Sequence, residues 1–198
     1  MVGGTQARMQ SASRRWSPPP AAAVPTRFSG MDPETVAIHD ADHVYQLKIG
    51  LTRLRPPVWR RVLVPADTTL GGLHEIIQIA LEWEDDHLHV FTAGHLHYSD
   101  PFHELEGCAD ENTVSLEATL PRIGASITYR YDLGDSWDHT ITLEKMLDHD
   151  STLTYPTCIT GRGDAPVEDW IPDSSEPAAT PFDQDVLNRD LAALSVSE

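Results

Sequence analysis

The chain has 198 residues, with 31 acidic and 14 basic side chains, and its formal net charge at pH 7 is −17. A chain of this length buries enough surface for one domain with a proper hydrophobic core and is too short for two full domains. Because so acidic a protein repels phosphate backbones at long range, nucleic-acid binding is disfavoured unless a local basic patch overrides the field.

Hydropathy and cysteine content predict a cytoplasmic protein. No apolar run approaches the roughly 20 residues that a membrane-spanning helix needs, so we expect no membrane contact. Cys108 and Cys158 lie far apart, in no spacing typical of a metal site. We therefore expect two reduced thiols.

Residues 1–40 are rich in Ser, Ala, Pro and Arg and lack hydrophobic periodicity. This composition predicts a disordered N-terminal arm, because it offers too little apolar surface to offset the entropy lost on ordering. An abrupt change of composition at Met31 suggests that translation starts there rather than at Met1.

Two strands are predicted next, separated by paired prolines. Apolar and polar residues alternate from Tyr45 to Leu51, as in a half-buried strand. Pro56 and Pro57 cannot donate to a ladder, so they interrupt the strand before a second alternating run begins.

Four arginines surround this junction: Arg53, Arg55, Arg60 and Arg61. They are the most concentrated basic group of the body and are candidates to bind a phosphate or a carboxylate. Alternatively, they neutralise the protein's own acidic side chains. Since consecutive strand residues point to opposite faces, only one of Arg60 and Arg61 can face the core.

A helix is predicted over Leu70–Leu81, after a threonine N-cap. Its apolar residues recur at three- and four-residue steps, so one face should lie on the sheet. Gly71 and Gly72 in the first turn indicate either a close backbone approach or a weak turn. His74 lies beside the apolar face, where we expect a hydrogen-bonded boundary residue rather than a ligand.

Histidines alternate in the next predicted hairpin. His87 and His89 precede a turn at Gly94, and His95 and His97 follow it. In extended conformation each pair projects from one face, so up to four imidazoles could share one side. They would suit zinc or iron if a third group completed the site; otherwise they form a hydrogen-bonded or pH-sensitive face.

A second hairpin is the centre of the predicted sheet. Its two alternating runs are Ile127, Tyr129 and Tyr131 before a polar turn, and Trp137, His139, Ile141 and Leu143 after it. Gly134 can take a positive φ in this turn, and Asp132 and Asp135 can accept hydrogen bonds from neighbouring backbone amides.

The histidine strand and this turn together suggest a candidate site. A metal site would use His87, His89, Asp135 and His139, with Asp132 as a further carboxylate. The candidate catalytic groups are Asp132, Asp135 and His139. The competing interpretation is that the aspartates only cap the turn, which needs no metal.

The remaining segments are predicted mainly as loops. Residues 99–121 should form a polar loop, and residues 148–170, after the second hairpin, a further loop that lies back over the sheet. The tail, residues 171–198, is acidic and carries a loose apolar stripe over residues 182–194, which predicts a short C-terminal helix.

Residues 43–170 resemble the plasmid pRiA4b ORF-3-like family, whose members occur beside transposable elements as passenger or resolvase-like (TnpR-like) proteins. The motifs that carry the resemblance are Tyr45-x-Leu47-x-Ile49, Arg55-Pro56-Pro57-Val58-Trp59-Arg60-Arg61, Leu73-His74, Asp86-His87-Leu88-His89, Tyr131-Asp132-Leu133-Gly134-Asp135 and Tyr155-Pro156-x-Cys158. The resemblance implies a curved antiparallel-rich sheet with helices on one side, and it implies no particular reaction. Relatives commonly carry a second cysteine where this chain has Ala165, so a site of paired cysteines is not expected.

We therefore predict an α+β fold with one domain, in which helices cover one side of a curved, antiparallel-rich mixed sheet. The favoured function is a non-catalytic, mobile-element-associated interaction domain that binds a partner protein and no cofactor. One alternative is a hydrolase or nuclease-like enzyme that depends on a divalent transition metal. Another is a DNA-binding passenger protein that acts in transposition through the four arginines.

Overall fold

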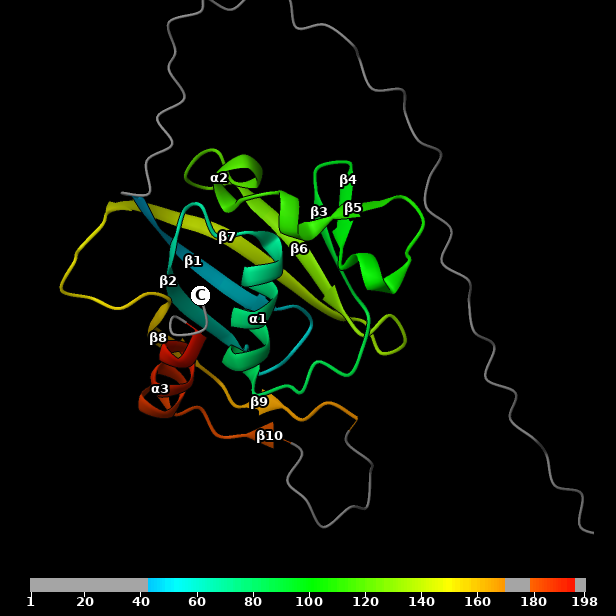
Figure 1. Cartoon of the computed structure of the whole chain (residues 1–198). Helices are drawn as coiled ribbons and strands as arrows, with labels where there is room; N and C mark the ends of the chain where they lie inside the picture. Colours follow the sequence, from blue (N-terminus) through cyan, green and yellow to red (C-terminus); the bar gives the residue numbers. More distant parts are fainter. Residues whose placement is uncertain (1–42, 170–178, 195–198) are drawn as a thin grey trace, which may run out of the picture.

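A computed structural model describes residues 43–169 and 179–194 (Figure 1). The predicted disordered arm at residues 1–40 and the predicted start at Met31 lie outside these ranges. The elements in chain order are β1 (His43–Leu51), β2 (Trp59–Pro65), α1 (Leu70–Leu81), β3 (His89–Ala93), β4 (Leu96–Ser99), η1 (Pro101–His103), β5 (Cys108–Asp110), η2 (Glu111–Thr113), α2 (Leu116–Thr119), β6 (Ser126–Tyr131), β7 (Trp137–Asp148), β8 (Thr157–Arg162), β9 (Ala165–Pro166), β10 (Ala179–Thr180) and α3 (Gln184–Leu194). None of the helices in the described ranges is long and apolar enough to cross a bilayer.

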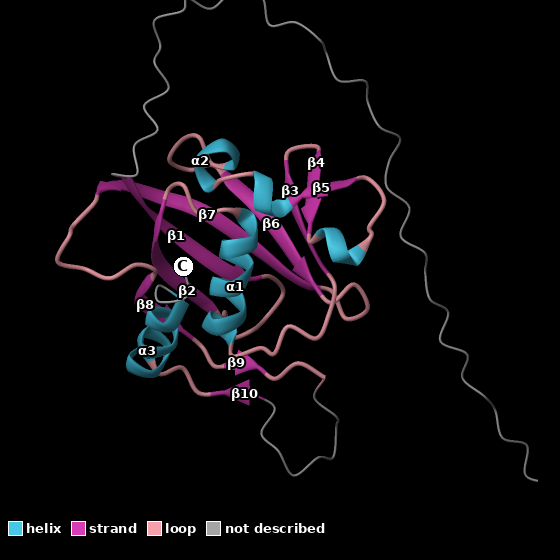
Figure 2. Ribbon diagram, viewed as in Figure 1, coloured by secondary structure: helices cyan, strands magenta, loops and turns pink. Residues whose placement is uncertain are grey.

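The described chain is organised around one sheet of 8 strands in the order β5-β4-β3-β6-β7-β1-β2-β8. Neighbouring strands run antiparallel except β4 and β5, which are parallel. Helix α1 crosses one face of this sheet, and α3 lies beside β8 (Figure 2). The predicted α+β fold, with a mixed, antiparallel-rich sheet and helices on one side, is confirmed.

The core lies between α1 and the covered face of the sheet. Leu70, Leu73 and Ile77 recur at helical spacing and are completely buried. They belong to one apolar cluster with Leu47 of β1 and Ile141 of β7. Burial of each such side chain stabilises the fold by about 1.5–3 kcal/mol, so this packing fixes α1, and with it His74, against the central strands.

The first turn of α1 has the predicted cap and also a close approach. Thr69 Oγ1 accepts a hydrogen bond from Gly72 N at 3.1 Å. A Cβ atom at Gly71 would clash with the Asn112 side chain of η2. The absence of a side chain at Gly71 therefore lets η2, which carries Glu111, pack against the helix.

Two segments predicted as loops contribute to the core. Residues 99–121 include β5, η2 and α2, and both Leu116 and Leu120 are completely buried. The segment before residue 170 includes β8, which pairs with β2 and buries Cys158. The loop predictions were wrong because isolated apolar residues in a polar segment show no periodicity, and only the neighbouring elements make them part of the core.

Helix α3, within the segment 182–194 predicted as helical, is attached to the edge strand β8 by one side chain. Asn188 Oδ1 accepts a hydrogen bond from Cys158 N at 2.7 Å, and Asn188 Nδ2 donates to Cys158 O at 2.9 Å. The amide thus satisfies backbone groups that an edge strand leaves unpaired.

Asn188→Ala should therefore lower the free energy of unfolding by about 1–3 kcal/mol, because it removes both partners of a half-buried peptide group. Arg189→Ala, on the exposed side of the same helix, should change it by less than about 0.5 kcal/mol. Urea unfolding at neutral pH measures both values. Equal effects of the two variants would mean that Asn188 does not hold α3 on β8.

Candidate functional site

The histidine-bearing strand and the aspartate-bearing turn lie in one sheet, as predicted. Across the β3–β6 pair His89 is opposite Tyr131, and across the β6–β7 pair Tyr129 is opposite His139. The side chains of β3, β6 and β7 that face α1 are therefore close neighbours.

The turn between β6 and β7 differs from the prediction. Asp132 and Ser136 have positive φ values of 53° and 60°, whereas Gly134 does not have a positive φ. Asp132 Oδ1 accepts a hydrogen bond from Gly134 N at 2.7 Å, as predicted for turn capping. Aspartate tolerates left-handed backbone because its short carboxylate bonds locally, so the prediction that Gly134 supplies the positive φ was wrong.

The residues of the predicted metal and catalytic site are not brought together. His87 Nε2 is bonded to Asp169 Oδ2 at 2.9 Å, and Asp132 lies near this pair. His89 belongs to a different, buried group. Neither Asp135, which is exposed, nor His139 joins any group of three potential ligands in the described part of the chain. The predicted strand alternation does not apply to His87 and His89, because β3 begins at His89 and His87 lies outside the strand.

His139 is a core residue. It is completely buried, and its ring contacts Tyr129 and Trp83 at centroid distances of 5.3 and 5.5 Å. Nδ1 donates to Trp137 O at 2.8 Å. Burial lowers the pKa of His139 to about 4, so the ring is neutral at pH 7 and inaccessible to a substrate.

The four candidate arginines do not form one patch. Arg60 points into the core and is 1% exposed, whereas Arg61 lies on the opposite face and donates from Nη2 to Glu144 Oε1 at 2.9 Å. Arg53 and Arg55 are exposed between β1 and β2. The prediction that only one of Arg60 and Arg61 faces the core is confirmed, and this alternation separates the group.

A buried polar cluster lies between α1 and β3. The rings of His74 and His89 stack with centroids 3.7 Å apart and planes 11° apart, and the side chains are 7% and 3% exposed. His74 Nδ1 is 2.8 Å from Tyr129 Oη, and its Nε2 is 2.9 Å from Asp85 Oδ1. One potential ligand atom from each of His74, Asp85 and His89 lies within 4.8 Å of the others.

Glu111 of η2 closes this cluster from the other side of His89. Its carboxylate oxygens lie 2.8 and 3.0 Å from His89 Nε2, and its side chain is 2% exposed. Burial raises the pKa of Glu111 to about 7 and lowers the pKa of His74 and of His89 to about 4. Both imidazoles are therefore neutral at pH 7.

Three members of this cluster were not predicted as ligands from the sequence. His74 was expected only to form a hydrogen bond, which it does, while Asp85 and Glu111 lie in segments without periodic pattern. The one available signal was a histidine beside the apolar face of α1, since such a side chain must meet a polar partner when the helix is covered.

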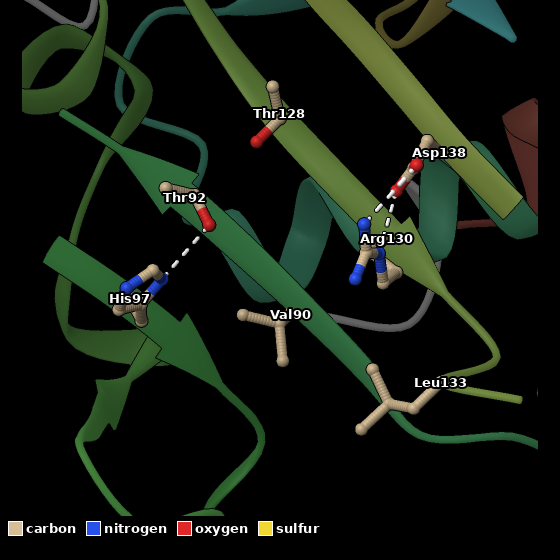
Figure 3. A pocket seen from close by; sticks show the side chains of 7 residues that line it. All are labelled: Val90, Thr92, His97, Thr128, Arg130, Leu133 and Asp138. Carbon is tan, nitrogen blue, oxygen red and sulfur yellow. Dashed lines mark hydrogen bonds and ion pairs between the residues drawn. The ribbon is translucent and has the colours of Figure 1, made fainter. Parts of the chain in front are cut away.

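The face of the sheet opposite α1 is polar. A hollow of about 180 Å³ lies on this face, and within it Arg130 is bonded to Asp138 through Nε–Oδ1 at 2.7 Å and Nη2–Oδ2 at 3.3 Å (Figure 3). The residues that line it are Val90, Thr92, His97, Thr128, Arg130, Leu133 and Asp138.

A second hollow of about 260 Å³ adjoins the first along the same face, because Thr140 in its lining is paired with Thr128. A continuous row of residues runs through both hollows, with small residues at its centre and larger ones at its two ends, and we call this row the threonine groove. In sheet order its residues are His97, Thr92, Thr128, Thr140, Gly50 and Trp59.

Comparisons with known proteins agree with this architecture. The chain is 36% identical over 128 residues to the uncharacterized protein y4hQ of Sinorhizobium fredii, a match that covers 64% of this chain and 66% of that protein. A crystal structure of a protein of unknown function, MM3350 from Methanosarcina mazei Go1, superposes with a TM-score of 0.57 at 32% identity and covers 65% of this chain and 74% of that one. The family model for plasmid pRiA4b ORF-3-like proteins matches residues 43–171. The chain therefore belongs to the plasmid pRiA4b ORF-3-like protein family.

Proposed function

We propose that this chain is a non-catalytic interaction domain that binds an extended, acidic segment of a partner protein in the threonine groove. The observation that carries the proposal is the threonine groove itself, whose small central residues are flanked on both sides by cations. On one side lies Arg130, with Arg53 Nη2 3.9 Å from the Asp138 carboxylate that Arg130 also contacts. On the other side lie Lys48 and Arg61, which are partners across β1 and β2.

The dimensions of the groove suit an extended chain. The row crosses six strands, and because neighbouring strands lie about 4.8 Å apart it spans roughly 24 Å, or about seven residues in extended conformation. Gly50 and the threonines keep its floor low, while Trp59 closes one end with Lys48 Nζ 5.4 Å from its ring.

Charge favours an acidic partner within this groove although the whole chain is acidic. The field of distant carboxylates is screened over about 8–10 Å at physiological salt, so the cations in direct contact decide short-range binding. Asp138 and Glu144 engage Arg130 and Arg61 only in part, since Asp138 bonds Nε and Nη2 of Arg130 and leaves Nη1 able to donate.

The geometry gives less support to catalysis by Asp132, Asp135 and His139, because His139 is buried and Asp135 is exposed and joins no group of potential ligands among the described residues. It also gives less support to DNA binding through the four arginines, because Arg60 and Arg61 lie on opposite faces of β2 and the four do not form one patch. A cytoplasmic location, in which Cys108 and Cys158 stay as free thiols, and an association with mobile elements remain part of the proposal. The latter rests on the family resemblance.

The test is binding of a labelled Ser-Glu repeat peptide to the full chain, followed by fluorescence anisotropy at low salt. We expect saturable, salt-sensitive binding that weakens at least about tenfold in Thr140→Trp, since an indole fills the groove and a tenfold change corresponds to about 1.4 kcal/mol. Thr154→Trp, at an exposed threonine outside the groove, is the matched control and should bind like the parent.

Three outcomes contradict this proposal. If single-stranded DNA binds the groove and the peptide does not, the partner is a nucleic acid rather than a protein. Peptide binding that Thr140→Trp and Thr154→Trp weaken equally, or no binding of the peptide at all, would remove the groove as the binding surface.

A further inference from the structure

We infer that His74, Asp85 and His89 form a binding site for one divalent transition-metal ion, independent of the threonine groove on the opposite face of the sheet. The two imidazole nitrogens and one carboxylate oxygen come from α1, the connection that follows it, and the start of β3. Their potential ligand atoms lie within 4.8 Å of one another. In a tetrahedral site with bonds of about 2.0–2.1 Å, ligand atoms are roughly 3.3 Å apart. Side-chain rotations that draw the ligand atoms together and tilt the two stacked rings, whose planes are 11° apart, would complete the site.

The two histidines are held as metal-ligating histidines usually are, with one ring nitrogen fixed by an outer partner. His74 Nδ1 lies 2.8 Å from the Tyr129 hydroxyl, which also accepts a hydrogen bond from Gln78 Nε2 at 3.0 Å. This leaves His74 Nε2 on the side of Asp85, at 2.9 Å. The helix and β6 thus fix the ring with its Nε2 directed towards Asp85.

His89 supplies a second, independent observation. Its Nε2 faces the Glu111 carboxylate, and its Nδ1 is buried without a hydrogen-bond partner in the described part of the chain. An unpartnered polar atom in a core is costly, by about 1–3 kcal/mol, and is therefore rare. A metal ion would take the free lone pair of Nδ1, and Glu111 would then complete a carboxylate–histidine–metal arrangement.

The donor set selects the class of ion. Two imidazoles and one carboxylate suit zinc, iron(II) and related first-row ions, whereas calcium and magnesium prefer all-oxygen sites. Asp85 is the open side of the cluster, since its side chain is 55% exposed while the two histidines are buried. An ion would therefore enter past Asp85 and keep solvent as its fourth ligand, with Glu111 as the outer partner of His89.

A different group of potential ligands, His87, Asp132 and Asp169, gives weaker support for an ion. Its members are half-buried or exposed, and His87 Nε2 already has a partner in Asp169. Asp132 Oδ1 is also engaged by the turn. This group serves as an internal control for the site that we propose.

The test uses the full chain, stripped of metal with a chelator and titrated with Zn²⁺ and with Co²⁺. We expect one ion per chain by calorimetry, a Co²⁺ absorption spectrum typical of nitrogen and oxygen ligands, and a rise in Tm on Zn²⁺ addition. Ca²⁺ and Mg²⁺ should produce none of these changes. Because outer-shell changes alone cost about 10–100-fold in affinity, Asp85→Asn should weaken Zn²⁺ binding by about 100-fold or more, and Glu111→Gln by about tenfold.

Asp86→Asn is the matched control, because it removes the same charge from the next residue, which is also exposed. It should bind Zn²⁺ and Co²⁺ like the parent chain, as should His87→Ala. The inference is overturned if Asp85→Asn and Asp86→Asn bind equally, if His87→Ala abolishes binding, or if no stoichiometric ion binds. Since Asp85 lies at the surface, the first comparison does not depend on a variant that fails to fold.

Discussion

Arg60→Ala is expected to lower the free energy of unfolding by at least about 3 kcal/mol, because it leaves buried backbone carbonyls without donors and opens a cavity in the core. The guanidinium is 1% exposed, and its donors go to backbone carbonyls rather than to a carboxylate. Nε donates to Ala80 O at 3.1 Å, near the C-terminal end of α1, and Nη1 donates to Gly163 O at 3.0 Å. The ring of Phe182 lies 4.2 Å from the guanidinium carbon.

This one side chain joins three parts of the fold, which explains the size of the effect. It donates to a carbonyl near the C-terminal end of α1, where the helix dipole also favours a cation. It also donates to the carbonyl of Gly163 after β8 and contacts the ring of Phe182 before α3. Alanine would leave these carbonyls buried without donors and open a cavity.

Urea unfolding of the full chain at neutral pH measures the effect of Arg60→Ala. Arg60→Lys should recover only part of the stability, because one ammonium cannot reproduce the planar fork that spans both carbonyls. Arg61→Ala is the neighbouring control; its ion pair with Glu144 is partly exposed, so the loss should stay within about 1 kcal/mol. A loss as large for Arg61→Ala as for Arg60→Ala would contradict the assignment of Arg60 to the core.

The stability of the protein should fall as the pH is lowered from about 6.5 towards 4, and His139 is one named cause. Burial lowers its pKa in the folded state to about 4, whereas the unfolded chain has an ordinary value near 6.5. Between these values the unfolded state binds a proton that the folded state does not. Stability is therefore fully present above about pH 6.5 and is lost as the pH falls, by about 3 kcal/mol over the whole window.

Comparison of the parent chain with His139→Gln isolates this contribution. Glutamine does not titrate, so the difference in unfolding free energy between the two proteins should shrink by about 2 kcal/mol from about pH 6.5 to about pH 5. His74 and His89 have pKa values shifted in the same direction, but they are present in both proteins and cancel in the difference. A difference that stays constant with pH would show that the pKa of His139 is the same in the folded and in the unfolded protein.

Periodic patterns accounted for the elements that the sequence predicted well. Helix α1 begins at Leu70 and ends at Leu81 as predicted, because its apolar stripe and its threonine cap are local features. The strands β6 and β7 likewise follow from alternation, which also places Arg60 and Arg61 on opposite faces. Each of these features depends on residues that are close in sequence.

The candidate site was predicted less well, because it depends on contacts between distant segments. The sequence indicated histidines and aspartates of the right types but grouped them by alternation, which joined His87 to His89. In the fold, β3 starts at His89, and the packing of α1 brings His74 to its ring instead.

The sequence by itself determined the α+β class, the covering helix and the polar character of one sheet face, since periodicity and turn chemistry act over a few residues. Only the tertiary structure decided that Glu111 reaches His89 and that Cys158 and Leu120 join the core. It also decided that residues of six strands, with small ones at the centre, align into one groove. The physical reason is that strand register and helix docking are set by burial summed over the whole sheet, and no local pattern contains that sum.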